Sequence, residues 1–125
     1  MEADEREAAF TAGAQLFDQG EYLAAHELFE ELWESSEGGD ADFYKGLVQA
    51  AIALHHLAAG NLEGADKLHS GQRRFLAPFL PRHRGIDLLR FLAEMQRCLA
   101  AARELSPGTP ARIDPARRPR LIFPG

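Results

Sequence analysis

Apolar residues recur along this chain at the three- and four-residue steps of amphipathic helices, and strand-like alternation is nearly absent. The pattern predicts five helices, at about residues 4–17, 21–34, 40–60, 61–77 and 85–104. One apolar seam runs along the last segment, as in a helix that packs nearly antiparallel on others; it consists of Leu88, Leu92, Met95, Leu99 and Ala102. The fold class is therefore all-α, a compact bundle of about five helices.

Glycine, asparagine and proline separate the predicted helices. Two glycines precede Asp40, which we expect to be the N-cap of the third helix. Gly60 should end that helix in the left-handed conformation, and Asn61 should cap the next one. Pro78 and Pro81 end the fourth helix, because proline cannot continue a helical hydrogen-bond ladder.

The two predicted turns around Gly20 and Gly60 form an internal repeat. Aligning these glycines also aligns Ala25 with Ala65, and small residues at that position let two helices approach closely. The run Gly20-Glu-Tyr22-Leu-Ala-Ala25 resembles the core of a tetratricopeptide hairpin, although only two units are present. We expect two stacked tetratricopeptide-like hairpins, followed by a C-terminal helix and an extended tail.

The last twenty residues differ from the rest in composition. Residues 106–125 hold five of the seven prolines, with four arginines against one acidic residue. The tip Leu121-Ile122-Phe123 is too apolar for a solvated linker, so we expect it to dock on the domain or on a neighbouring subunit. Residues 1–105 are predicted to be a single helical domain, with 106–125 as a docked basic tail.

Charge changes sign along the chain. Residues 1–37 hold eleven acidic residues and one arginine, whereas both later segments have a small positive excess. A basic cluster near the corner between the fourth and fifth helices is either solvated or a docking patch for the acidic first third; its members are Arg73, Arg74, Arg82, Arg84 and Arg90. The net charge of −5 and the absence of a basic surface interleaved with aromatics argue against nucleic acid as a partner.

The cellular setting follows from what the chain contains. Its apolar runs are too short to cross a bilayer, so no membrane partner is expected. A single cysteine, Cys98, suits a reducing compartment, and we expect a cytoplasmic protein and an inert, partly buried thiol. A homo-oligomer is possible, because the acidic and basic segments could attract each other between chains. His69 and His83 lack paired ligands at metal spacing and are expected on the surface.

The second helix holds the first group of candidate site residues. Tyr22 and His26 lie on one apolar stripe with two further aromatic side chains, which places His26 on a largely buried face. Glu30 lies four residues after His26, and Glu27 lies three residues before Glu30, so the three side chains can converge.

The third helix holds the second group. It is apolar nearly all round, which predicts a central helix, with Trp33 of the preceding helix packed against it. Its few polar groups are informative for that reason. Tyr44 and His55 share one stripe, and Gln49 lies on another with His56.

These residues permit a metal site. The spacing His26-Glu27-x-x-Glu30 is similar to the zincin motif, with a carboxylate in place of the second histidine. His26, Glu30 and His55 would then be ligands of a divalent ion such as zinc or manganese, with Glu27 as the catalytic base. Antiparallel packing of the two helices should bring His26 within direct or one-water reach of His55. A histidine beside an apolar stripe is, however, more often a core residue bonded to a tyrosine or carboxylate.

The combined pattern resembles the domain of unknown function 309 family over about residues 10–80. The residues that carry the likeness are Phe17, Gly20, Tyr22, Ala25, His26, Glu27, Glu30, Trp33, Phe43-Tyr44-Lys45-Gly46-Leu47, Gln49, Ala51, Ala53, His55, Gly60, Asn61, Gly64 and Ala65. The resemblance implies a small all-helical protein of bacteria or archaea with no assigned activity. It also suggests the hypothesis of a metal-dependent hydrolase.

Two hypotheses remain open. The first is a helical binding or interaction module whose polar cluster fixes the register of its helices; the cluster residues are Tyr22, His26, Glu27, Glu30, Tyr44, Gln49 and His55. The second is a metal-binding protein or metal-dependent hydrolase. The missing second histidine of the zincin motif favours the first hypothesis, and the gathering of ionisable groups on two buried helices favours the second.

Overall fold

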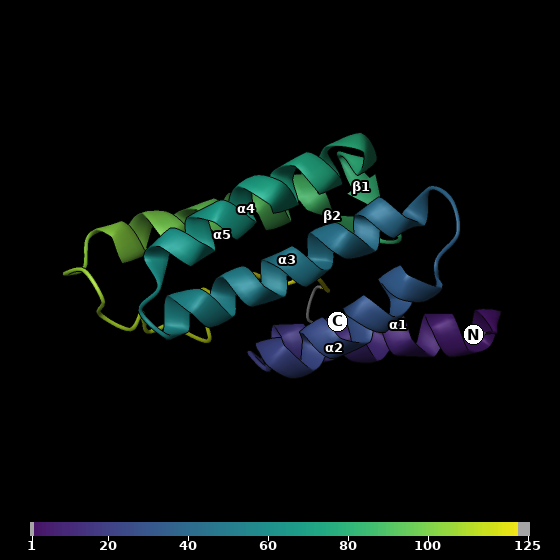
Figure 1. Cartoon of the computed structure of the whole chain (residues 1–125), viewed down its shortest axis with the longest axis horizontal. Coiled ribbons are helices and arrows are strands. Elements are labelled where there is room, and N and C mark those ends of the chain that lie inside the picture. Colours follow the sequence, from purple (N-terminus) through teal and green to yellow (C-terminus); the bar gives the residue numbers. More distant parts are fainter. Residues whose placement is uncertain (1, 123–125) are drawn as a thin grey trace.

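The computed structural model describes residues 2–122 and confirms the all-α fold class. Its five helices are α1 (Ala3–Asp18), α2 (Tyr22–Ser35), α3 (Asp40–Ala58), α4 (Leu62–Leu76) and α5 (Leu88–Arg103). α3 lies in the middle, with α1 and α2 on one side and α4 and α5 on the other (Figure 1). No helix among the described residues is long and apolar enough to span a membrane.

The central helix supplies much of the core, as its sequence predicted. Leu47, Ala51 and Leu54 are all fully buried. Gly46 allows close approach of α4, because a Cβ atom at this position would lie 2.6 Å from the side chain of Leu76. The predicted contact of Trp33 with this helix is also present, since the Lys45 ammonium lies 4.1 Å from the centre of the Trp33 ring.

The two repeated turns have the same geometry. Gly20 and Gly60 adopt φ values of +86° and +84°, which glycine reaches without strain. After each, the next N–H donates back to a helix carbonyl: Glu21 to Leu16 at 2.9 Å, and Asn61 to His56 at 2.8 Å. This Schellman pattern satisfies carbonyls that the helix end would otherwise leave unpaired. The predicted cap at Asn61 is confirmed, since its side chain accepts the Gly64 N–H at 2.9 Å.

The start of α3 differs from the prediction. Asp40 is the first residue of the helix rather than its cap, and the N-cap position, Gly39, has no side chain to accept a hydrogen bond. The Asp40 carboxylate instead contacts His83 Nε2 at 2.9 Å and Arg84 at 3.6 Å. Arg84 also reaches Glu7 on α1, 3.5 Å away, so one member of the basic cluster does pair with the acidic first third.

Both histidines expected on the surface are at least partly buried. His83 packs between the rings of Phe43 and Phe79, with centroids 4.6 Å from each. His69 is 6% exposed, and its Nδ1 is hydrogen-bonded to Gln72 Oε1 at 2.9 Å. Sequence spacing gave no sign of either environment. The rings around His83 come from other elements, and the pairing of His69 with Gln72 was not predicted.

The connection between α4 and α5 contains two strands that the sequence did not predict. After a short 3₁₀ turn (Ala77–Phe79), β1 (Arg82–His83) pairs antiparallel with β2 (Ile86–Asp87). The hairpin delays the start of the last helix to Leu88, three residues after the predicted start. Asp87 caps it by accepting the Arg90 N–H at 3.0 Å.

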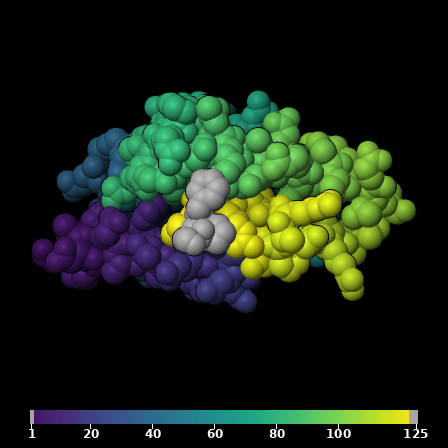
Figure 2. Space-filling view, turned by 180° about the vertical axis from the view of Figure 1, so that it is seen from behind, coloured from purple at the N-terminus to yellow at the C-terminus, as the bar shows by residue number. Residues whose placement is uncertain are grey.

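The tail runs back along the bundle after α5. Figure 2 shows it, in yellow, lying between α5 and the N-terminal helices. The Ala111 N–H donates to the carbonyl of Leu57 at 2.9 Å, and Leu121 is 1% exposed. The predicted return of the apolar tip is therefore seen for Leu121. Ile122 is 39% exposed, and Phe123 lies outside the described residues.

Candidate functional site

The predicted pair on α2 is formed. His26 Nε2 lies 3.1 Å from a carboxylate oxygen of Glu30, and the two side chains are 22% and 41% exposed. His26 is therefore only partly exposed, on the face that the sequence predicted to be largely buried. Glu27 is exposed. An ion pair with this much solvent access contributes little to stability.

Tyr22 and His55 lie together at another place. Both line a shallow hollow of about 410 Å³ beside the Gly20 turn, together with Arg118 of the tail. The Tyr22 hydroxyl is buried and has no hydrogen-bond partner within residues 2–122. Burial raises the pKa of Tyr22 to about 12, and the nearby charge of Arg118 partly opposes this shift.

Tyr44 is buried in the interior, and Gln49 is partly buried against α4. The Tyr44 side chain is fully buried, and its hydroxyl finds no hydrogen-bond partner in the described part of the chain. The Gln49 amide packs over Gly71 of α4, where a Cβ atom would lie 2.3 Å from its oxygen. Both residues lie at contacts between helices, and their part in a polar site stays a prediction.

No three His, Cys, Asp or Glu side chains among residues 2–122 are grouped so that they could hold a metal ion. The structure joins His26 to Glu30 and places His55 in the hollow with Tyr22. No third ligand is in place among these described residues, and the zinc or manganese site stays a prediction.

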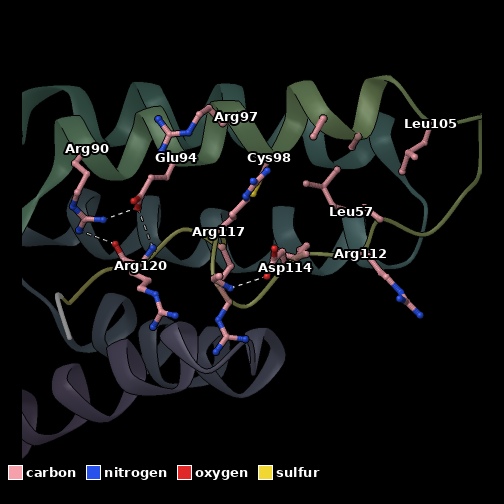
Figure 3. Close-up of a pocket in the computed structure, with 16 residues that line it drawn as sticks. Leu57, Arg90, Glu94, Arg97, Cys98, Leu105, Arg112, Asp114, Arg117 and Arg120 are labelled. Atoms are coloured by element: carbon pink, nitrogen blue, oxygen red, sulfur yellow. Dashed lines mark hydrogen bonds and ion pairs between the residues drawn. The ribbon is translucent and has the colours of Figure 1, made fainter.

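A larger cavity lies between α5 and the returning tail. We call it the α5–tail groove; it has a volume of about 860 Å³, within the usual range for small-molecule sites. Figure 3 shows side chains from α5 on one wall and from the tail on the other. The groove is lined by Leu57, Arg90, Glu94, Arg97, Cys98, Ala101, Ala102, Leu105, Ala111, Arg112, Ile113, Asp114, Ala116, Arg117, Arg118 and Arg120.

The groove is strongly basic. Its lining includes six arginines and two acidic residues. Arg90 is paired with Glu94 at 2.5 Å. The side chains of Arg97, Arg112 and Arg117, by contrast, form no ion pair or hydrogen bond with any described residue. Such uncompensated guanidinium groups, lining one cavity, favour the binding of an anion.

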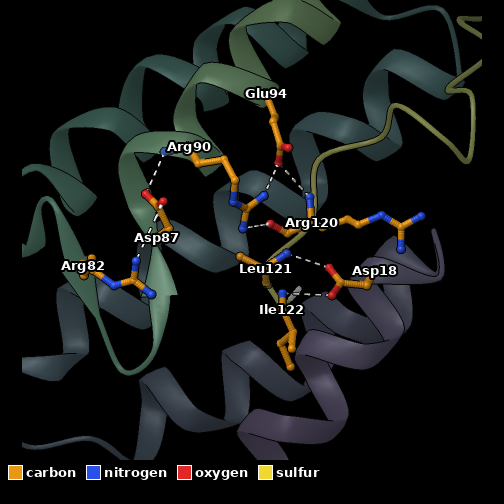
Figure 4. Close-up of polar contacts among 8 residues, drawn as sticks. All are labelled: Asp18, Arg82, Asp87, Arg90, Glu94, Arg120, Leu121 and Ile122. Atoms are coloured by element: carbon orange, nitrogen blue, oxygen red, sulfur yellow. Dashed lines mark hydrogen bonds and ion pairs between the residues drawn. The ribbon is translucent and has the colours of Figure 1, made fainter. Parts of the chain in front are cut away.

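Backbone and side-chain contacts hold the tail wall in place, as Figure 4 shows. The Arg120 N–H donates to Glu94 at 3.2 Å, and its carbonyl accepts from the guanidinium of Arg90 at 2.9 Å. Further along, Asp18 of α1 accepts the N–H groups of Leu121 and Ile122 at 2.6 and 2.9 Å. Burial raises the pKa of the Asp18 carboxyl above its ordinary value, and the two backbone donors oppose that effect.

Cys98 lies in the wall of this groove and is half-buried. Burial raises the pKa of its thiol, which the positive charge of Arg97 partly opposes. Burial thus favours the protonated, less nucleophilic form of this thiol.

Sequence reasoning missed the groove. Arg97 and Arg117 each look like a solvated charge, and no local spacing connects them. The available signal was the excess of arginine in a proline-rich tail whose apolar tip was predicted to dock. That signal places basic residues against the bundle without naming the helix that they face.

Comparisons with known proteins agree with the predicted family. Residues 10–68 match the model of the family described as "Domain of unknown function (DUF309)". The chain is also similar to a protein of Aquifex aeolicus (strain VF5) described as "Uncharacterized protein", with 31% identity over 96 residues. The alignment covers 75% of this chain and 29% of that relative, so the chain spans less than a third of the relative's length. No solved structure matches the chain.

Proposed function

We propose that this protein is a helical binding module that holds an anionic ligand in the α5–tail groove. One observation carries the proposal: Arg97 and Arg117 line a single cavity, and neither has an ionic partner among the described residues. Holding these positive charges close together raises the electrostatic free energy of the protein, and a bound anion would lower it.

The architecture supports binding as the role of the fold. The two hairpins share one turn geometry, and we interpret them as a tetratricopeptide-like pair that acts as a rigid support. In this proposal, residues 1–105 form one helical domain, and residues 106–125 dock on it to complete the binding site. The groove then exists only while the tail is in place.

Pyrophosphate is the probe that tests the proposal, because arginine side chains can bind this anion through its charge alone. Titration into ¹⁵N-labelled protein should shift the resonances of α5 and of residues 111–120, with saturation. Arg97→Gln together with Arg117→Gln should weaken this binding at least tenfold, since each charge-assisted contact is worth about 1.5–3 kcal/mol.

The matched control is Arg73→Gln together with Arg74→Gln, which removes two exposed arginines outside the groove. It should leave pyrophosphate affinity within about twofold. Equal loss in the control and in the groove variants would show that only the overall charge matters, and would contradict the proposal. Alkylation of Cys98 gives a second readout, because a bound anion should slow it.

A metal-dependent role is the second candidate, and the contact between His26 and Glu30 favours it. Zinc or manganese would then raise the melting temperature in proportion to the logarithm of its concentration. His26→Ala should abolish that rise. An unchanged melting temperature for the metal-free and metal-supplemented protein would remove this candidate and leave the groove proposal intact.

A further inference from the structure

We infer that the ligand of the α5–tail groove is an amphipathic anion: a phosphate or carboxylate head with an extended apolar body. The inference rests on the proposed function and specifies its ligand class. It comes from the uneven distribution of polar and apolar side chains along the groove.

One end of the groove is polar. Figure 3 shows Arg90, Glu94 and Arg120 together at this end, with Arg97 next along α5. Arg90 and Glu94 already satisfy each other and hold the tail, so they act as a fixed end wall. Arg97 and Arg117 remain as the groups that can bind an anionic head.

The other end is apolar. Figure 3 places Leu57 and Leu105 here, and Arg112 points away from the helices. Alanine and isoleucine side chains continue this surface. Leu105 is 41% exposed, which makes it one of the few large apolar side chains that the described fold leaves in contact with water.

A simple inorganic anion would satisfy the arginines and leave this apolar end wet. An apolar body attached to the anion would cover Leu105 and its neighbours, and removing that surface from water favours binding. The order of the side chains also fixes the direction of the ligand, with its head at Arg97 and its body towards Leu105.

An alkyl phosphate series tests the inference. Inorganic phosphate, butyl phosphate, hexyl phosphate and octyl phosphate are titrated by calorimetry below their micelle-forming concentrations. Affinity should rise about two- to threefold per added methylene, because each would be at least partly buried. An affinity independent of chain length would overturn the inference.

Two substitutions separate this inference from the proposed function. Leu105→Ser should flatten the dependence on chain length and leave inorganic phosphate unaffected. Its control is Leu89→Ser, on α5, outside the groove and 57% exposed. Arg97→Gln should weaken every member of the series by the same factor. If Arg97→Gln weakens binding but affinity does not depend on chain length, only the amphipathic ligand is overturned. If neither substitution weakens binding, both proposals are overturned.

The same chemistry could be offered by a free metabolite or by a lipid headgroup. Co-sedimentation with phosphatidylcholine vesicles containing phosphatidic acid distinguishes the two sources. We expect no co-sedimentation, because the tail covers one side of the groove. Binding to vesicles that is lost with Arg97→Gln and Leu105→Ser would support the ligand class and identify a lipid as its source.

Discussion

Residues in the family-matching part of the chain mainly pack the core, whereas the α5–tail groove holds the candidate ligand-binding side chains. Residues 10–68 contain most of the buried aromatic side chains and both glycine turns. Among the residues that line the groove, only Leu57 falls in that range. The residues that match the family model therefore serve mainly to pack the helices against one another. The candidate binding side chains lie on α5 and the tail, outside the matched range.

The largest expected effect tests the packing half of this comparison. Ala51 is fully buried on the central helix, so Ala51→Glu would place an unpaired charge in the core. We expect a loss of about 3 kcal/mol or more in the free energy of unfolding, measured by urea denaturation. Ala58→Glu, on an exposed position of the same helix, should change it by less than about 1 kcal/mol. Similar losses in both variants would mean that α3 is not the centre of the fold.

The second prediction concerns the tail. Leu121→Ala should cost about 2 kcal/mol, because it removes a side chain that is 1% exposed. The same variant should weaken pyrophosphate binding while circular dichroism keeps its helical signal. Ile122→Ala, at the exposed neighbouring position, should do neither. Full binding by a variant without residues 106–125 would place the anion site elsewhere.

The helical hairpins could be predicted from the sequence because their causes are local. Gly20, Gly60 and Asn61 act on backbone groups within a few residues, and the apolar stripes have a fixed period. Other features depend on distant partners. Asp40 was expected to be a cap, yet it contacts His83, forty-three residues further along. The groove is the extreme case, since Arg97 and Arg117 share a cavity only after the tail has docked.

A third prediction uses the Tyr22 hydroxyl, which links the two regions because it lies beside Arg118 of the tail. Its pKa is about 12 in the folded protein and near 10.0 when exposed. The unfolded state therefore loses this proton first, so the contribution of Tyr22 to stability is complete below pH 10 and declines as the pH rises through 12. Between pH 10 and pH 12, the free energy of unfolding of the Tyr22→Phe variant should fall by on the order of 1–2 kcal/mol less than that of the unsubstituted protein.

At neutral pH, Tyr22→Phe should be neutral or slightly stabilising, because it deletes a buried hydroxyl without a hydrogen-bond partner among the described residues. A clear loss of stability at pH 7 would show that this hydroxyl is satisfied in solution. Thermal denaturation of both proteins from pH 7 to pH 12 measures the two effects together.

The smallest effect is expected for the pair that first drew attention in the sequence. His26→Ala should cost less than about 1 kcal/mol, since the ion pair that it breaks is partly open to solvent. It should leave pyrophosphate binding unchanged, which would keep the motif helix and the groove functionally separate. A tenfold loss of binding in this variant would join them and contradict the comparison above.

The contact between Asp18 and Leu121 has a consequence for the order of folding. The two residues are 103 positions apart, so their contact closes almost the whole chain into a loop. The helical hairpins close short loops and lose little chain entropy, whereas this closure loses more and rests on few interactions. The hairpins should therefore assemble first and the tail should dock last. By the same reasoning, the tail should open first in local unfolding, so that amide exchange is faster at Leu121 than in the buried part of α3.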